Sequence, residues 1–239
     1  MPLGILLPRM QTRKPLLIGA FALILIGAGL WFTGVFSFNS EPGVPSLERP
    51  LTFPENFPAE ARTAIETNTA RLKSDLEADP GNISAWLDLA IQYKAVNDFD
   101  GAVEIWKYLA EAKDNSIAYY NLGNIYHLYL KDFPTSERYY HKAIEMTPSM
   151  PLNYVGLHEL YRYSYKQDSN LAIETLNEGM ENTDERGRVD LYIALAAYHL
   201  EKGETSRALL AYTEARALAV ELGNTALVNS LDSQIRSIE

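Results

Sequence analysis

A short pattern of aromatic and aliphatic residues recurs four times along this chain, and it constrains the fold more than any other feature. Each copy has an aromatic residue, a leucine three residues later, and a tyrosine or histidine seven residues after the first position. The copies begin at Trp86, Tyr119, Tyr154 and Tyr192, so their starts lie 33, 35 and 38 residues apart. Self-similarity at a period of about 20–50 residues indicates a stack of like supersecondary units.

Each copy is followed by a second stripe whose members are spaced four and three residues apart. That spacing places them on one face of an α-helix. No proline occurs from Leu152 to the end of the chain, and no stretch shows sustained strand alternation. The sequence therefore predicts an all-α chain built from helix pairs. The stripes are Ala102, Trp106 and Leu109; Ser136, Tyr140 and Ala143; Ala172, Leu176 and Gly179; and Ala208, Tyr212 and Ala215.

The paired pattern resembles the tetratricopeptide repeat (TPR) family, whose unit of about 34 residues reads W-x2-L-G-x2-Y…A-x3-F…P. It departs from that pattern most in the third unit, where the turn is longer and Gly179 replaces an alanine. The resemblance implies a TPR-type α-solenoid of about four helix pairs plus flanking helices, with the first helix of each pair lining a concave groove. The predicted domain is 58–239, with repeats at 83–115, 116–150, 151–187 and 188–222.

Two further helices are expected to flank the repeats. Residues 58–78 form a helical stretch that ends at Asp79-Pro80-Gly81 and is expected to cover the open edge of the first unit. Residues 224–238 are amphipathic through Leu227, Leu231 and Ile235. They match the solvated capping helix that a repeat stack needs at its end.

The N-terminal part of the chain predicts a membrane anchor. Residues 16–36 carry no charge, and a helix of that length reaches about 31 Å, close to the thickness of a bilayer core. Basic residues precede this run and Glu41 follows it. The positive-inside tendency then predicts a cytoplasmic segment 1–15, a transmembrane helix 16–38 and an extracytoplasmic remainder. A cleaved signal peptide and a buried soluble helix are the alternatives.

Residues 39–57 and the following Pro58 contain five of the 12 prolines, a density that excludes helix and sheet interiors and predicts a semi-extended linker over 39–57. Phe53 and Phe57 are candidates for docking on the following domain.

The layout resembles bacterial inner-membrane proteins that carry an extracytoplasmic repeat domain. That group includes an ancillary subunit of the secretion translocon and the apocytochrome-binding protein of cytochrome c maturation.

The charge balance argues against nucleic acid as a partner. Removing Arg9, Arg13 and Lys14 from the 21 Lys and Arg leaves 18 against 31 Asp and Glu, so residues 41–239 carry a formal charge of −13. Phosphate binding rests on clustered cations, which this domain lacks. The acidic domain instead favours a basic or apolar partner.

No motif points to catalysis, a metal or a cofactor. The chain has no cysteine, no phosphate-binding glycine loop and no G-x-S-x-G motif. His158-Glu159 begins like a zinc-protease helix, but Arg162 stands where the second histidine is required. We therefore predict no catalytic, metal or cofactor-binding residues and no enzyme activity, with a hydrolytic enzyme as the remote alternative.

The resemblance instead implies a partner-binding groove, which we expect to hold a protein or peptide segment. The corresponding function is a membrane-anchored, non-catalytic interaction scaffold in envelope assembly, secretion or protein maturation. A self-associating structural module of a membrane complex is the alternative. Carried over residue by residue, the groove positions are Leu87, Ile91, Lys94, Tyr120, Asn124, His127, Glu159, Arg162 and Tyr163, with Ala95, Leu128, Val155, Ile193, Ala197 and Leu200 beside them.

Overall fold

The structure is a computed structural model that describes residues 43–238. In this range the chain forms ten α-helices and no strand. The predicted cytoplasmic segment 1–15 and transmembrane helix 16–38 lie outside it. None of the described helices is both long and apolar enough to cross a bilayer. The helices are α2 (Ala59–Ala78), α3 (Ile83–Ala95), α4 (Phe99–Ala112), α5 (Ser116–Leu128), α6 (Phe133–Met146), α7 (Pro151–Tyr163), α8 (Leu171–Asn182), α9 (Glu185–Glu201), α10 (Thr205–Glu221) and α11 (Thr225–Ile238).

Local sequence signals set where many of these helices begin and end. The Asn82, Asp98 and Asn115 side chains accept hydrogen bonds from backbone N–H groups three residues later, at 3.0, 3.1 and 2.9 Å, which caps α3, α4 and α5. The turn after the first helix of each pair contains a residue with positive φ. These turn residues are Asn97, Lys131, Lys166 and Gly203.

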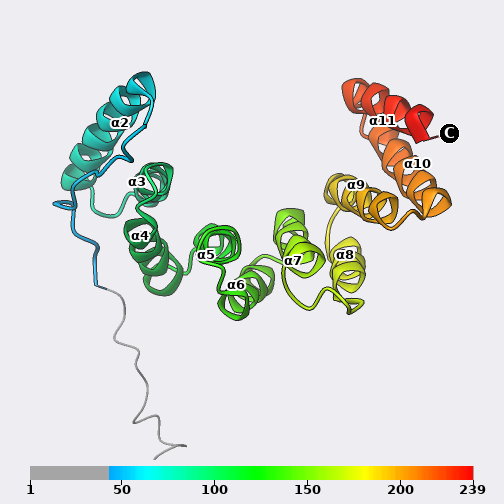
Figure 1. Cartoon of the computed structure of the whole chain (residues 1–239), viewed down its shortest axis with the longest axis horizontal. Helices are drawn as coiled ribbons and strands as arrows, with labels where there is room; N and C mark the ends of the chain where they lie inside the picture. The colour runs from blue at the N-terminus through cyan, green and yellow to red at the C-terminus, as the bar shows by residue number, and fades with distance from the viewer. Residues whose placement is uncertain (1–42, 239) are drawn as a thin grey trace, which may run out of the picture. The chain divides into compact units, whose positions relative to one another are not determined.

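Helices that follow one another in the chain pack side by side, so α2 and α11 lie at opposite ends of the row (Figure 1). The pairs α3–α4, α5–α6, α7–α8 and α9–α10 form the repeating units, and α7 also contacts α5 and α9. The motif residues fill the interfaces: Trp86, Tyr140 and Tyr154 are at most 1% exposed. The prediction of an all-α solenoid of the TPR type is confirmed for the described residues.

The Tyr140 ring shows why small residues recur in the pattern. It lies between Gly123 of α5 and Gly156 of α7, and a Cβ added to either glycine would sit 2.6 Å from the ring. The Tyr140 hydroxyl donates to Asn124 Oδ1 at 3.0 Å. Two helices from successive pairs therefore pack against the same aromatic ring. Glycine is required at both contact positions, because a Cβ would be too close to the ring.

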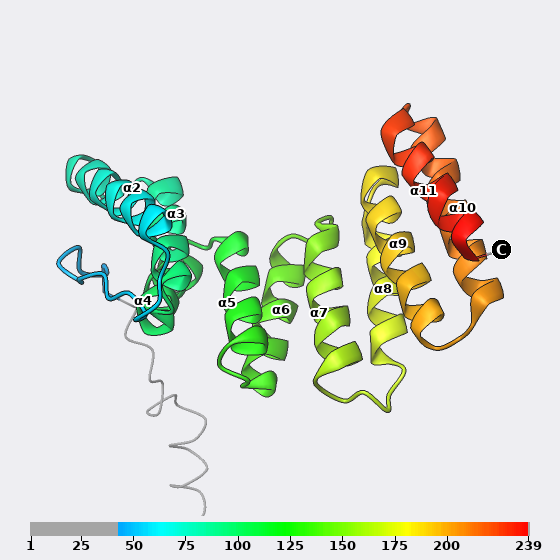
Figure 2. The same cartoon turned by 45° about the horizontal axis from the view of Figure 1, so that its top comes forward.

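Residues 43–57, here called the strap, pack on the first repeat instead of forming a free linker (Figure 2). Leu47 and Leu51 pack against the core around α3 and α4. The Arg49 carbonyl accepts hydrogen bonds from Tyr93 Oη (3.0 Å) and Lys73 Nζ (2.7 Å). The Arg49 guanidinium also pairs with both Asp98 carboxylate oxygens at 2.6 Å. Most of the predicted linker is thus part of the packed unit.

Candidate functional site

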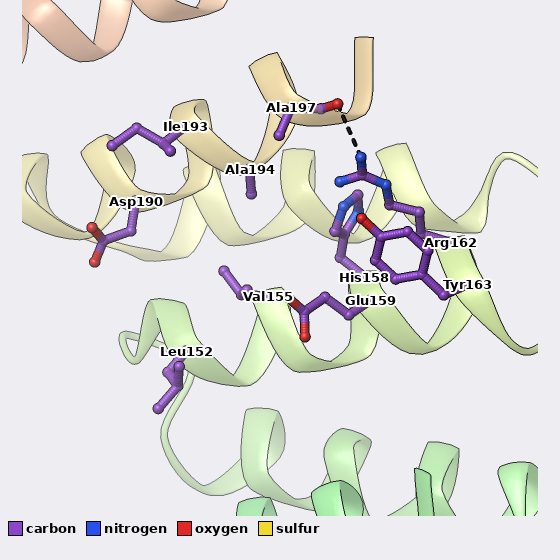
Figure 3. Close-up of a pocket in the computed structure, with 10 residues that line it drawn as sticks. All are labelled: Leu152, Val155, His158, Glu159, Arg162, Tyr163, Asp190, Ile193, Ala194 and Ala197. Atoms are coloured by element: carbon purple, nitrogen blue, oxygen red, sulfur yellow. Dashed lines mark hydrogen bonds between the residues drawn. The ribbon is translucent and has the colours of Figure 1, made fainter. Parts of the chain in front are cut away.

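A pocket of about 400 Å³ opens between α7 and α9, the first helices of the third and fourth repeats (Figure 3). Its lining residues recur three or four positions apart on each helix, so they form one face of α7 and one face of α9. The opposite faces hold the buried consensus positions. The lining comprises Leu152, Val155, His158, Glu159, Arg162 and Tyr163 from α7, and Asp190, Ile193, Ala194 and Ala197 from α9.

Arg162 fixes one end of the pocket. Its guanidinium donates to the Ala197 carbonyl at 2.9 Å and to Glu201 Oε2 at 2.7 Å, so it ties the C-terminal ends of α7 and α9 together. The side chain is only 9% exposed, and its charge lies 4.7 Å from the ring centre of Tyr163. These contacts occupy the guanidinium within the protein and leave Tyr163, which is 52% exposed, at the pocket rim.

Two carboxylates face the pocket without a partner. Neither Glu159 nor Asp190 forms a hydrogen bond or an ion pair within residues 43–238. Partial burial raises the pKa of Glu159, an effect that Arg162 partly offsets, and burial also raises the pKa of Asp190. Both groups therefore lose some hydration without a compensating contact.

His158 supplies a further acceptor. Its Nδ1 lies 2.8 Å from the Ala172 carbonyl oxygen, so Nδ1 carries the proton and donates. The Nε2 atom is then a bare acceptor, and it has no hydrogen-bond partner although the side chain is 1% exposed. Burial lowers the pKa of His158 and favours this neutral form. In the sequence, His158 stands out only as the start of an incomplete zinc motif.

The other predicted groove residues lie on α3 and α5, away from this pocket. Ile91 is 42% exposed, whereas Leu87, Lys94, Tyr120 and Asn124 are half-buried. The Tyr120 ring packs against Tyr140 with centroids 5.9 Å apart, and Asn124 accepts from the Tyr140 hydroxyl. Of the nine principal positions, Glu159, Arg162 and Tyr163 line the pocket.

His127 needs a correction, because it does not face an open groove. Its side chain is 3% exposed, and Nε2 lies 2.9 Å from the Ser164 hydroxyl oxygen at the end of α7. The ring also packs edge-on against Phe133. His127 is therefore part of the contact between successive repeats.

The prediction missed three lining residues that helical periodicity from the predicted positions could have supplied. Leu152 lies three residues before Val155, Asp190 three before Ile193, and Ala194 three before Ala197. Leu152 and Asp190 extend a predicted groove face by one helical turn toward the N-terminus. His158 was not recoverable in this way, because its role depends on a carbonyl in the neighbouring helix.

Comparison with solved structures shows the same fold in two TPR proteins. The crystal structure of MamA matches with a TM-score of 0.50 and 19% sequence identity, over 69% of this chain and 94% of that chain. The crystal structure of PilW, described as a widely conserved type IV pilus biogenesis factor, matches with a TM-score of 0.51 and 18% identity, over 74% and 87% of the two chains. The fold is the tetratricopeptide-repeat fold. No protein-family model and no curated protein matches the sequence.

Proposed function

We propose that this chain is a non-catalytic interaction scaffold that binds a peptide segment of a partner protein in the pocket between α7 and α9. The observation that carries the proposal is the pocket itself. It combines apolar side chains with unpartnered polar atoms, and its volume of about 400 Å³ is within the range of ligand pockets. Both helices present the same repeat face, so a segment of chain bound there would contact two successive repeats.

The arrangement of titratable groups argues against a hydrolytic role. Arg162 is bound to Glu201 and to a backbone carbonyl, and the protonated nitrogen of His158 is bound to the Ala172 carbonyl. No serine or threonine lines the pocket to act as a nucleophile beside His158. The site is therefore suited to binding.

The proposal includes an anchor at residues 16–38, supported by the charge-free run and its basic flank. The repeat domain would then be extracytoplasmic at the inner membrane of a bacterial cell and act in envelope assembly, secretion or protein maturation. Confinement to the membrane would raise the effective concentration of the pocket for a partner in the same membrane.

Self-association is a second candidate function, because α10 has an apolar outer face. Leu210 and Val220 are 62% and 53% exposed, and with Ala217 they follow helical spacing on one side of the helix. A second copy of the chain could cover this face. Light scattering of the purified full chain, compared with the Leu210→Ser/Val220→Ser variant, distinguishes a dimer from a monomer.

The peptide-binding proposal is tested by photocrosslinking in native membranes. A benzophenone amino acid is placed at Val155, inside the pocket, or at Glu66, an exposed residue of α2, as a control. We expect a protein adduct from position 155 that is absent from position 66 and is blocked by Ala197→Trp, which fills the pocket. Equal adducts at both positions, or an adduct that Ala197→Trp leaves unchanged, would refute binding in the pocket.

A further inference from the structure

The polar atoms in the α7–α9 pocket are almost all acceptors. Glu159 and Asp190 present carboxylate oxygens without a partner, while Glu201 neutralises the charge of Arg162. The pocket thus retains two uncompensated negative charges. A bound group that supplied further acceptors would be repelled, whereas a donor-rich cation would form charge-assisted hydrogen bonds with a carboxylate. Figure 3 shows Glu159 near His158 and Arg162, and Asp190 at the other end of the pocket.

His158 points to the same kind of ligand by an independent observation. In Figure 3 its ring points from α7 toward α9, beside Glu159 and Arg162. The Nε2 acceptor is buried and has no donor within residues 43–238. Buried polar atoms are usually satisfied, so a ligand N–H that reached this acceptor would gain a hydrogen bond there.

The remaining lining is aliphatic and determines what must carry the cation. Leu152 and Val155 from α7 face Ile193 and Ala194 from α9 across the pocket (Figure 3). Arginine and lysine have long apolar stems that pack against such surfaces while the charged end reaches polar groups. A small free cation would leave this apolar surface without a contact.

We infer that the pocket recognises the side chain of an arginine or a lysine within an extended, otherwise apolar peptide segment. The charged end lies beside Glu159, pairs with its carboxylate and donates toward His158 Nε2. The stem packs on the aliphatic lining, and Asp190 adds negative charge from the other end of the pocket. This inference rests on the proposed function, because it specifies the ligand of the same site. Glu159 and Asp190 are part of the acidic excess of residues 41–239.

The test begins with selection from a random dodecapeptide phage library on the purified full chain in detergent micelles. The most enriched peptide is synthesised together with a version in which norleucine replaces its basic residue. Binding of both fluorescent peptides is measured by anisotropy to the wild type, to Glu159→Gln/Asp190→Asn, and to Glu66→Gln/Glu77→Gln. The last variant is the control, because it changes the net charge equally at exposed positions of α2.

We expect the enriched peptides to contain a basic residue among apolar ones. Replacing that basic residue with norleucine should weaken binding to the wild type and to the control variant about tenfold, as for a partly desolvated charge pair. In Glu159→Gln/Asp190→Asn the two peptides should bind within about threefold of each other. A His158→Phe variant should weaken binding of the basic peptide but not of the norleucine peptide.

Two other outcomes overturn the inference in distinguishable ways. Enriched peptides without a basic residue that still lose binding in Ala197→Trp would refute recognition of a cation and leave peptide binding in the pocket intact. If no peptide is enriched, or if Ala197→Trp binds every enriched peptide as well as the wild type, the proposed function fails and the inference fails with it.

Discussion

Substitution of Gly156 by alanine should lower stability, although alanine is the better helix former. A Cβ at this position would lie 2.6 Å from Tyr140 Cε1, 3.0 Å from Tyr140 Cζ and 3.1 Å from Tyr120 Cε2. Ordinary carbon contacts are about 3.5–4.0 Å. The Tyr140 ring cannot move away, because Gly123 contacts it from α5 and its hydroxyl is bound to Asn124.

The expected cost is the difference between two effects. Forcing an extra methyl group into a packed core costs about 1–3 kcal/mol, and replacing glycine by alanine in a helix returns about 1 kcal/mol. Because the Tyr140 ring is held on both sides, the packing cost should be about 2–3 kcal/mol, the upper part of that range. The net loss is then about 1–2 kcal/mol, which corresponds to a fall in Tm of about 2–8 °C for a chain of this size. Thermal unfolding of the full chain, followed by circular dichroism at 222 nm, measures it.

Two further variants make the reasoning refutable. Gly43→Ala is the control, because a Cβ there meets no atom within 4 Å, and its Tm should match the wild type. Tyr140→Leu removes the clashing ring, so Gly156→Ala should cost much less in that background. A Gly156→Ala chain as stable as the wild type, or an equal cost in both backgrounds, would show that the glycine does not serve to admit Tyr140.

Three other predictions concern ionisable groups. The hydrogen bond from Arg49 lowers the pKa of Asp98 below its ordinary 3.8. This pair therefore stabilises the fold above pH 3.8, and the stabilisation is lost as the pH falls through the lowered pKa. Arg49→Ala should speed limited proteolysis of the strap at pH 7, and the difference from the wild type should fade in acid. Because burial raises the pKa of Glu159, its ionisation destabilises the fold as the pH rises through that pKa, and Glu159→Gln should match the wild-type Tm near pH 4 but exceed it at pH 7. His127→Ala should cost about 2 kcal/mol and Ser164→Ala about 1 kcal/mol in denaturant unfolding; additive losses in the double variant would argue against their hydrogen bond.

The helix pairs could be predicted from sequence because the residues that define them act locally. Aromatic residues such as Trp86 and Tyr140 stand at fixed spacings from small residues in each repeat, and those spacings alone place them on one helical face. The strap could not be predicted in this way. A high proline content excludes regular structure but does not reveal docking, and the bond between Arg49 and Asp98 joins residues 49 positions apart.

The candidate site was predictable in position but not in character. The resemblance to the TPR family placed Glu159 and Arg162 on the groove face of α7, and both residues line the pocket. It could not show that Arg162 is bound to Glu201 or that His127 meets Ser164, since both partners come from other helices more than 30 residues away. Helical register determines which face a residue occupies, and tertiary partners determine whether it is free to bind.

The strap also determines how the repeat domain responds to mechanical load. The Arg49 carbonyl is held by Lys73 of α2 and Tyr93 of α3, and its guanidinium is held by Asp98 at the start of α4. Tension applied to the chain before residue 43 would therefore be divided among three helices. It would not reach the first turn of α2 until these contacts broke, so the strap protects the array from being unwound from its N-terminal end.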